Sequence, residues 1–211
     1  MTKKERMLSV ARKLFWKKGF ESTTMIDIAR AYGCKPGNIY NFFKDKEDIL
    51  FQALLEEMEQ IIDPIKHLEE TPNGSPIDQL RTIIMSHLQL TLSHRRTAKL
   101  LFDIGLDNLS PSKRKEIIAL RDMYDRILRK VIQRGTQDGS FDKLDERIAS
   151  IMISSMVVRT RMWFHNKKGM SIEELAEFII EFAIRGLGGN LPNDLTGDPK
   201  ERQGGRNFVD P

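Results

Sequence analysis

The chain has 211 residues, 40% of them hydrophobic and 30% charged, which is ordinary for a soluble protein that combines a small module with a larger domain. Its single cysteine excludes an internal disulfide and a cysteine-based metal cluster. No apolar run approaches the roughly 18 residues of a membrane helix, and no signal-peptide-like segment follows the charged N-terminus, so we expect a cytoplasmic protein with no membrane partner.

The net charge of +4 is unevenly distributed along the chain. Residues 1–50 contain eleven Lys and Arg against six Asp and Glu, which gives this part a net charge of +5 and the remainder −1. A positive field confined to one module is what a phosphate-binding surface requires. The charge distribution therefore favours nucleic acid as a partner of the N-terminal fifty residues.

Residues 24–46 have the pattern of two short helices separated by a tight turn. Thr24 can cap the first helix, which places Met25 and Ile28 on one face and ends where Gly33 can adopt the left-handed conformation of a turn. Pro36 suits the first turn of the second helix, because its missing amide costs nothing there.

The second helix directs apolar and polar side chains to opposite faces. Ile39 and Phe43 are spaced to face a core, which leaves Lys35, Asn38, Tyr40 and Asn41 outward. Amide side chains reach base edges, a tyrosine meets a phosphate or a thymine methyl, and lysines neutralise phosphates. The segment therefore predicts a helix-turn-helix that reads double-stranded DNA.

The ordered set Thr24, Ile28-Ala29, Gly33, Gly37, Tyr40, Phe43 and Lys46 resembles the DNA-binding domain of the tetracycline-repressor (TetR) family of bacterial transcription regulators. With the preceding helix that ends at residues 14–20, the resemblance covers about the first fifty residues. It implies that Thr24 and Lys46 clamp phosphates, that Gly37 lets the recognition helix approach the duplex, and that Tyr40 contacts the backbone or a thymine methyl. Lys35 and Cys34 depart from the family pattern, which usually has a serine or threonine and an aliphatic residue there. The predicted DNA-binding residues are Thr24, Lys35, Pro36, Gly37, Asn38, Tyr40, Asn41 and Lys46.

Helical periodicity continues through the rest of the chain. We expect helices over 3–18, 46–68 with a kink or stop at Pro64, 76–93, 97–106 and from Pro111 to about Gly135. No strand pattern appears, so the sequence predicts an all-α protein of about nine helices. We expect a three-helix DNA-binding domain over 1–48, a helical ligand-binding and dimerisation domain over 49–188, and a disordered tail over 189–211.

The last two predicted helices, 145–166 and 171–187, favour a homodimer. The first is apolar on more than one face, and Ser171 with Glu174 forms a capping box that opens the second. The family resemblance implies that both helices pair with their copies in a four-helix bundle, as a protein that reads a two-fold operator would need. The alternative is a core formed wholly within one chain.

The candidate effector site centres on Arg159, which shares a helical stripe with Met152, Met156 and Trp163. An arginine there must find an anion: either Asp103 or Asp125 in a salt bridge, or an anionic ligand bound with help from Arg161. In the second case the ligand would lie beside an apolar pocket. The predicted effector-binding residues are Phe102, Tyr124, Met152, Met156, Arg159 and Trp163.

A second resemblance concerns the class of effector. Arg159 with Trp163, followed by Lys167-Lys168-Gly169 and the helix led by Ser171, is similar to the fatty-acid and sterol catabolism branch of the family. That resemblance implies an acyl-CoA thioester, whose chain suits an apolar tunnel and whose phosphates suit basic side chains. His87 and His94 are expected to be core or surface histidines rather than metal ligands.

Together these observations predict a ligand-responsive repressor that a small effector releases from a palindromic operator. One alternative is a DNA-binding factor without an effector. Another is an enzyme in the helical domain, which the lack of a nucleophile elbow, a phosphate loop or paired carboxylates disfavours. We expect no cofactor, no metal and no catalytic residues.

Overall fold

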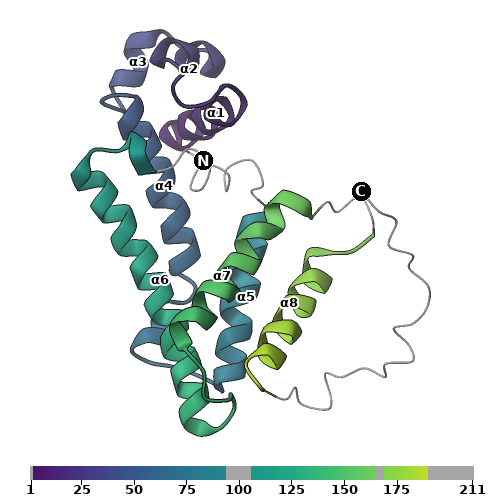
Figure 1. Ribbon diagram of the computed structural model, residues 1–211. Helices are drawn as coiled ribbons and strands as arrows, with labels where there is room; N and C mark the ends of the chain where they lie inside the picture. The colour runs from purple at the N-terminus through teal and green to yellow at the C-terminus, as the bar shows by residue number, and fades with distance from the viewer. Residues whose placement is uncertain (1, 94–105, 165–168, 190–211) are drawn as a thin grey trace.

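The computed structural model describes residues 2–93, 106–164 and 169–189 (Figure 1). These ranges contain eight α-helices, two short 3₁₀ helices and no strand, which confirms the all-α prediction. The helix expected over 97–106 lies outside the described residues except for Leu106, and so does the tail after Gly189.

Three helices form a head at one end of the molecule: α1 (Lys3–Lys18), α2 (Met25–Tyr32) and α3 (Pro36–Tyr40) (Figure 1). The bounds of α1 match the sequence prediction, and Thr2 and Glu5 form a capping box at its start. The interior of the head consists of fully buried apolar side chains, among them Leu8, Phe15, Ile28, Ile39 and Phe43.

Helix α4 (Lys46–Ile62) leads from the head into the body (Figure 1). The Asp45 carboxylate caps it by accepting a hydrogen bond from the Asp48 amide at 2.7 Å. The helix ends at Ile62, before Pro64, instead of reaching Leu68, because a proline has no amide hydrogen to continue the helical hydrogen bonds. A 3₁₀ turn, η1 (Lys66–Glu69), follows.

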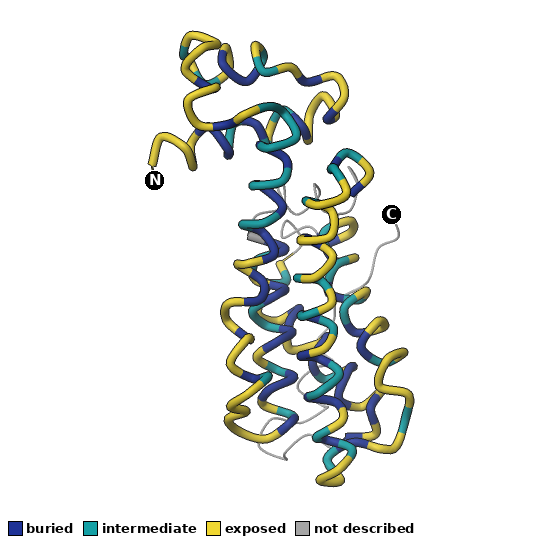
Figure 2. The backbone as a smooth tube through the Cα atoms, turned by 90° about the vertical axis from the view of Figure 1, so that its left-hand side faces the viewer, coloured by how far each residue is buried: buried dark blue, intermediate teal, exposed yellow. Residues whose placement is uncertain are grey.

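The body contains α5 (Pro76–Ser93), α6 (Pro111–Asp138), α7 (Glu146–Trp163) and α8 (Ile172–Gly186), with the 3₁₀ turn η3 (Leu106–Asn108) preceding α6. Helix α5 packs against α6, α7 and α8, while α6 also packs against α4 and α7. Figure 2 shows the head at one end of this elongated body, and one continuous apolar cluster runs from the head along α4 into the body.

Helix α6 does not dissolve at Gly135 but continues to Asp138, where left-handed Gly139 ends it. Gly135 has a packing role instead: a β-carbon built there would lie 2.1 Å from the ring of Phe141. The glycine therefore lets the chain after α6 fold back and bury Phe141 against the helix.

In the described ranges, no helix combines the length and the apolar character needed to cross a membrane. Nor do His, Cys, Asp or Glu side chains gather there in groups of three or more that could hold a metal ion.

Candidate DNA-binding surface and effector site

The turn between α2 and α3 has the geometry that the sequence predicted. The Thr24 hydroxyl accepts from the Asp27 amide at 3.1 Å, the Asp27 carboxylate accepts from the Thr24 amide at 3.1 Å, and Gly33 ends α2 with φ 83°. The Asp27 carboxylate also accepts from the Thr24 hydroxyl at 2.9 Å, and the bonds that it accepts from the Thr24 amide and hydroxyl lower the pKa of Asp27. The Thr24 hydroxyl is thus engaged at the start of α2, yet the residue remains exposed.

Helix α3 exposes the side chains that were predicted to meet DNA. Ile39 and Phe43 are buried in the head, and Tyr40 is 55% exposed. A β-carbon at Gly37 would meet no atom within 4 Å, so nothing inside the protein requires a glycine there. Lys35 is the N-cap residue of α3, but its side chain makes no capping hydrogen bond, because an ammonium group has no acceptor. The predicted residues exposed on this surface are Thr24, Lys35, Pro36, Gly37, Asn38, Tyr40 and Asn41.

Lys46 occupies a different environment from these exposed residues. Its Nζ donates to the carbonyl oxygens of Phe20 at 2.8 Å and Glu21 at 3.3 Å, and it lies 4.2 Å from the centre of the Phe20 ring. Lys46 therefore ties the start of α4 to the segment between α1 and α2. Since an ammonium has three donors, one remains for the predicted phosphate contact.

Glu47, the next residue, joins α4 to the start of α6. Its carboxylate accepts from the Ser110 amide at 2.8 Å and lies 3.5 Å from Lys113 Nζ, and these partners lower its pKa. Ser110 makes no capping bond with its own side chain, so α4 supplies the cap of α6. No sequence signal pointed to this contact, because the partners are 63 residues apart.

Glu57 is a buried acid on the same helix that the sequence analysis overlooked. It is 9% exposed, its Oε2 has no hydrogen-bond partner within the described ranges, and burial raises its pKa to about 8 against the attraction of Arg12 and Arg161. Arg12, from α1, donates instead to the Ala53 carbonyl oxygen at 3.1 Å and to Glu56 at 2.8 Å. The sequence did contain a signal for this residue, because Glu57 has the helical spacing of the buried Leu50, Leu54 and Ile61.

Helices α7 and α8 together present an exposed apolar face. The side of α7 that packs on the body consists of Ser150, Ile153, Val157 and Thr160, a stripe distinct from the one that carries Arg159. The large side chains left exposed are between 53% and 62% accessible: Ile148, Ile151, Met152, Met162, Trp163, Phe178 and Phe182.

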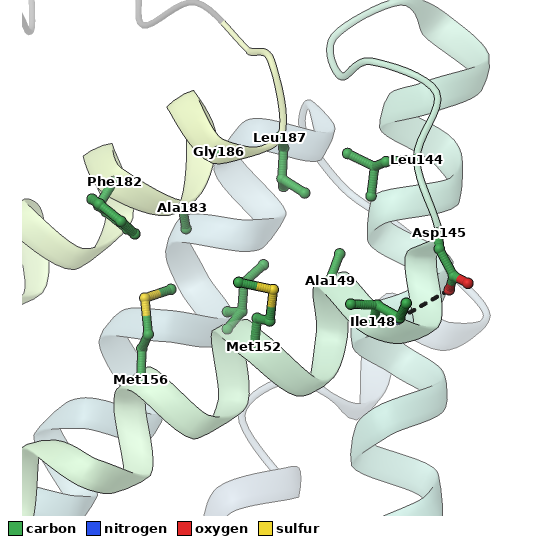
Figure 3. A pocket seen from close by; sticks show the side chains of 11 residues that line it. Leu144, Asp145, Ile148, Ala149, Met152, Met156, Phe182, Ala183, Gly186 and Leu187 are labelled. Carbon is green, nitrogen blue, oxygen red and sulfur yellow. Dashed lines mark hydrogen bonds between the residues drawn. The ribbon is translucent and has the colours of Figure 1, made fainter.

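This α7/α8 face is hollowed in two places. Figure 3 shows the first, a pocket of about 260 Å³ that lies between Met152 and Met156 of α7, Phe182 and Ala183 of α8, and Leu187, which follows α8. The second is an apolar groove of about 460 Å³ whose charged residue is Arg159. Its lining residues are Ser155, Met156, Arg159, Trp163, Leu175, Phe178, Ile179 and Phe182.

A third cavity, of about 470 Å³, is bounded by α4, α5, α6 and the side of α7 that carries the exposed Ile151, Ser155 and Arg159, and we refer to it as the inner cavity. Tyr124 and His87 line it and are 7% and 5% exposed, and Arg159 borders it as well as the outer groove. The full lining consists of Met58, Ile61, His87, Arg121, Asp122, Tyr124, Asp125, Ile151, Ser154, Ser155, Val158 and Arg159.

The structure does not gather the six predicted effector residues around one pocket. Tyr124 faces the inner cavity, whereas Met152, Met156 and Trp163 line the hollows of the α7/α8 face. Tyr124 is separated from the methionines and Trp163 because the residues of α7 that pack on the body are small or β-branched, from Ser150 to Thr160, and the methionines lie on another side of the helix. Phe102 lies outside the described residues, as does His94.

Arg159 is exposed and makes no ion pair with Asp125. Asp125 is instead paired with Arg129 at 2.8 Å and accepts from the Ser150 hydroxyl at 2.6 Å. Arg159 Nη1 contacts only the Met162 sulfur, at 3.6 Å, within the part of the chain that the structure describes. Asp103, the other partner considered, lies outside that part.

An exposed recognition helix on a three-helix head, carried by a helical body, defines a helix-turn-helix DNA-binding regulator. Residues 7–53 match the family model "Bacterial regulatory proteins, tetR family", and residues 73–187 match "Tetracyclin repressor-like, C-terminal domain". The chain belongs to the TetR family of bacterial transcriptional regulators.

Similar proteins align with this chain over most of both lengths. The chain is 22% identical over 188 residues to the HTH-type transcriptional repressor KstR2 of Mycolicibacterium smegmatis, covering 88% of this chain and 91% of that one. It is 25% identical over 184 residues to the fatty acid metabolism regulator protein of Bacillus subtilis, covering 86% and 94%. The crystal structure of AibR in complex with isovaleryl coenzyme A and operator DNA superposes with a TM-score of 0.76 at 20% identity, covering 86% and 97%.

Proposed function

We propose that the protein is a dimeric repressor that binds a palindromic operator and is released by an amphipathic, anionic effector, of which an acyl-CoA thioester is the leading candidate. The observation that carries the effector assignment is Arg159: an exposed arginine, without a carboxylate partner in the described ranges, beside an apolar groove. A ligand that joins an apolar chain to an anion suits this combination.

The DNA-binding part of the proposal rests on the exposed face of α3. Asn38 and Asn41 would hydrogen-bond base edges, Tyr40 would contact a thymine methyl or the backbone, and Lys35 would neutralise a phosphate. Gly37, which has no packing role, would allow the helix axis to come close to the duplex. The two recognition helices of a dimer would enter successive major grooves about 34–36 Å apart.

The dimer part rests on the α7/α8 face. Seven large apolar side chains exposed on two adjacent helices form a patch of the kind that marks a protein interface. A second copy of α7 and α8 would cover it and form a four-helix bundle. The groove beside Arg159 would then lie at the interface, where a ligand alters how two subunits sit together.

Two relatives support the effector class. The B. subtilis relative is named a fatty acid metabolism regulator, and AibR was crystallised with isovaleryl coenzyme A and DNA. In this chain, Arg159 would pair with a phosphate, and the acyl chain would enter one of the two hollows that Arg159 borders. To move a population from 1:99 to 99:1, the ligand must favour the DNA-free conformation by roughly 5.5 kcal/mol.

The test is a set of thermal-shift and DNA-release assays with acyl-CoA thioesters of different chain types and the corresponding free acids. We expect at least one thioester to stabilise the protein and release DNA, and Arg159→Met to abolish both responses while DNA binding persists. Arg147→Met, an exposed arginine on the same helix outside the groove, is the matched control and should respond like the wild type.

Two results would count against the effector assignment: no response to any thioester, or an Arg159→Met variant that responds like the wild type. The protein would then be a DNA-binding factor without this effector. Turnover of a thioester would point instead to an enzyme in the helical body.

A further inference from the structure

We propose that the inner cavity recognises a hydroxyl or carbonyl oxygen on the apolar part of the effector, through the paired side chains of His87 and Tyr124. This inference rests on the proposed effector-responsive function and deepens it, because it assigns a chemical class to the chain of the ligand. An oxygenated chain would be preferred over a saturated one.

The pair is formed by side chains from two helices. His87 on α5 and Tyr124 on α6 approach with 2.9 Å between Nδ1 and the phenol oxygen, and their rings meet edge to face with centroids 5.1 Å apart. Both residues are more than nine-tenths buried and both line the cavity of about 470 Å³. Polar groups at such depth normally have their hydrogen bonds satisfied.

Both members of the pair are neutral near pH 7. Burial lowers the pKa of His87 to about 4 and, together with the Asp125 charge, raises the pKa of Tyr124. A neutral imidazole has one donor and one acceptor nitrogen, and a phenol has one donor and accepting lone pairs.

The hydrogen-bonding capacity left to the cavity does not depend on the tautomer. If the phenol donates to Nδ1, the Nε2–H remains as a donor and the phenol oxygen as an acceptor. If Nδ1–H donates to the phenol, the phenol hydroxyl remains as the donor and Nε2 as the acceptor. Either way one donor and one acceptor remain, which match a hydroxyl, and the donor alone matches a carbonyl.

The walls around the pair offer an apolar path for part of a chain. Met58 and Ile61 of α4 and Val158 of α7 line it, while the charged side chains of the cavity belong to α6 and to Arg159, which lies at its exposed border: Arg121, Asp122, Asp125 and Arg159. A ligand with its anion at Arg159 would therefore extend its chain toward the buried His87–Tyr124 pair. A saturated chain would remove water from the pair without replacing its hydrogen bonds, so we expect it to bind about tenfold more weakly.

The experiment measures DNA release by the full-length protein with decanoyl-CoA and a series of decanoyl-CoA derivatives, each with one hydroxyl or keto group at a successive chain position. We expect at least one oxygenated thioester to act at about tenfold lower concentration than the saturated one. Tyr124→Phe keeps the ring and should reduce this preference to less than threefold, without weakening the saturated ligand. Tyr32→Phe, in the head, is the matched control and should keep the wild-type preference.

The inference is overturned if the saturated thioester acts as well as every oxygenated one, or if Tyr124→Phe keeps the preference. Either outcome leaves the effector assignment standing, whereas a lack of response to all thioesters contradicts that assignment. A second measurement covers this last case, using 2-decanone as the probe and the ring resonances of His87 by NMR. Saturable shifts that Tyr124→Phe weakens would support the site, and unchanged resonances would overturn it.

Discussion

Glu57 is a carboxylic acid on the face of α4 whose other buried residues are apolar, and its buried Oε2 has no hydrogen-bond partner among the residues that the structure describes. Its pKa is raised from an ordinary 4.5 to about 8, so the folded protein binds this proton more tightly than the unfolded chain does. Stability must therefore fall as pH rises from about 4.5 toward 8.

Glu57→Gln should remove this pH dependence. Because each unit of pKa shift corresponds to about 1.4 kcal/mol, we expect the variant to be more stable than the wild type by one to several kcal/mol, roughly, at pH 8. The difference should shrink toward pH 4.5 in urea unfolding measured at both pH values. Glu59→Gln, an exposed acid on the same helix, should show no such trend. Equal stability of wild type and Glu57→Gln at pH 8 would refute the buried-acid assignment.

Substitutions of Lys35 and Lys46 should distinguish a lysine that only contacts DNA from one that also stabilises the fold. Lys35→Ala should flatten the dependence of log K on log salt by about one unit for any duplex, because one phosphate contact is lost, and should leave the Tm unchanged. Lys46→Ala should flatten the slope similarly but also lower the Tm, since it loses the hydrogen bonds to the carbonyls of Phe20 and Glu21. An unchanged slope for Lys46→Ala would show that Lys46 contacts no phosphate.

At the scale of elements, the joint between head and body is residues 46 and 47 of α4. Lys46 donates a hydrogen bond to the segment after α1 in the head, and Glu47 accepts one from the start of α6 in the body. Two adjacent residues of α4 therefore contact both domains. A displacement of α6 would therefore be transmitted to the head through α4.

Glu47→Gln should loosen this joint. We expect faster hydrogen exchange at Ser110 and the following amides, and a loss of about 1 kcal/mol of stability near neutral pH, because a charged cap becomes a neutral one. The pKa of Glu47 is lowered, so the stabilisation exists above its ordinary value of 4.5 and is lost in acid as the carboxylate protonates. Glu116→Gln, an exposed acid on α6, serves as control. Unaltered exchange at Ser110 in Glu47→Gln would contradict the capping role.

Local signals in the sequence predicted most element boundaries, because caps act over three or four residues. The Thr24 and Ser171 capping boxes and the left-handed Gly33 are examples. The end of α6 was misplaced because Gly135 is required by Phe141, which folds back onto the helix, and composition alone does not distinguish such a glycine from a helix stop.

At the level of the whole molecule, the proposed binding to a palindromic operator requires a dimer. Phe178 and Phe182 are 61% and 57% exposed on α8, and the proposed bundle would bury them. Phe182→Glu should therefore give a folded monomer in light scattering that binds operator DNA at least about tenfold more weakly than the wild type. Ile118→Glu, on α6 away from this face, should remain dimeric. A Phe182→Glu variant that stays dimeric would place the interface elsewhere.

The two candidate sites were predictable to different extents. The DNA-binding face follows from one short segment, so its outward residues could be read from periodicity. The described residues of the predicted effector site come from α6 and α7, and their grouping depends on the rotation of α7, which turns Ile153 and Val157 toward the body. That rotation is set by tertiary packing, which the sequence does not reveal. The sequence prediction therefore placed Tyr124 and Trp163 in one pocket, whereas the structure has them on opposite sides of α7.

The most direct test of the central claim is selection of bound duplexes from a random DNA library by the full-length wild-type protein. We expect enrichment of an inverted repeat whose half-sites match two recognition helices, with base preferences inside each half-site that change in Asn38→Ala. No enrichment, or an enriched site without two-fold symmetry, would contradict a dimeric operator-binding regulator that reads DNA through α3.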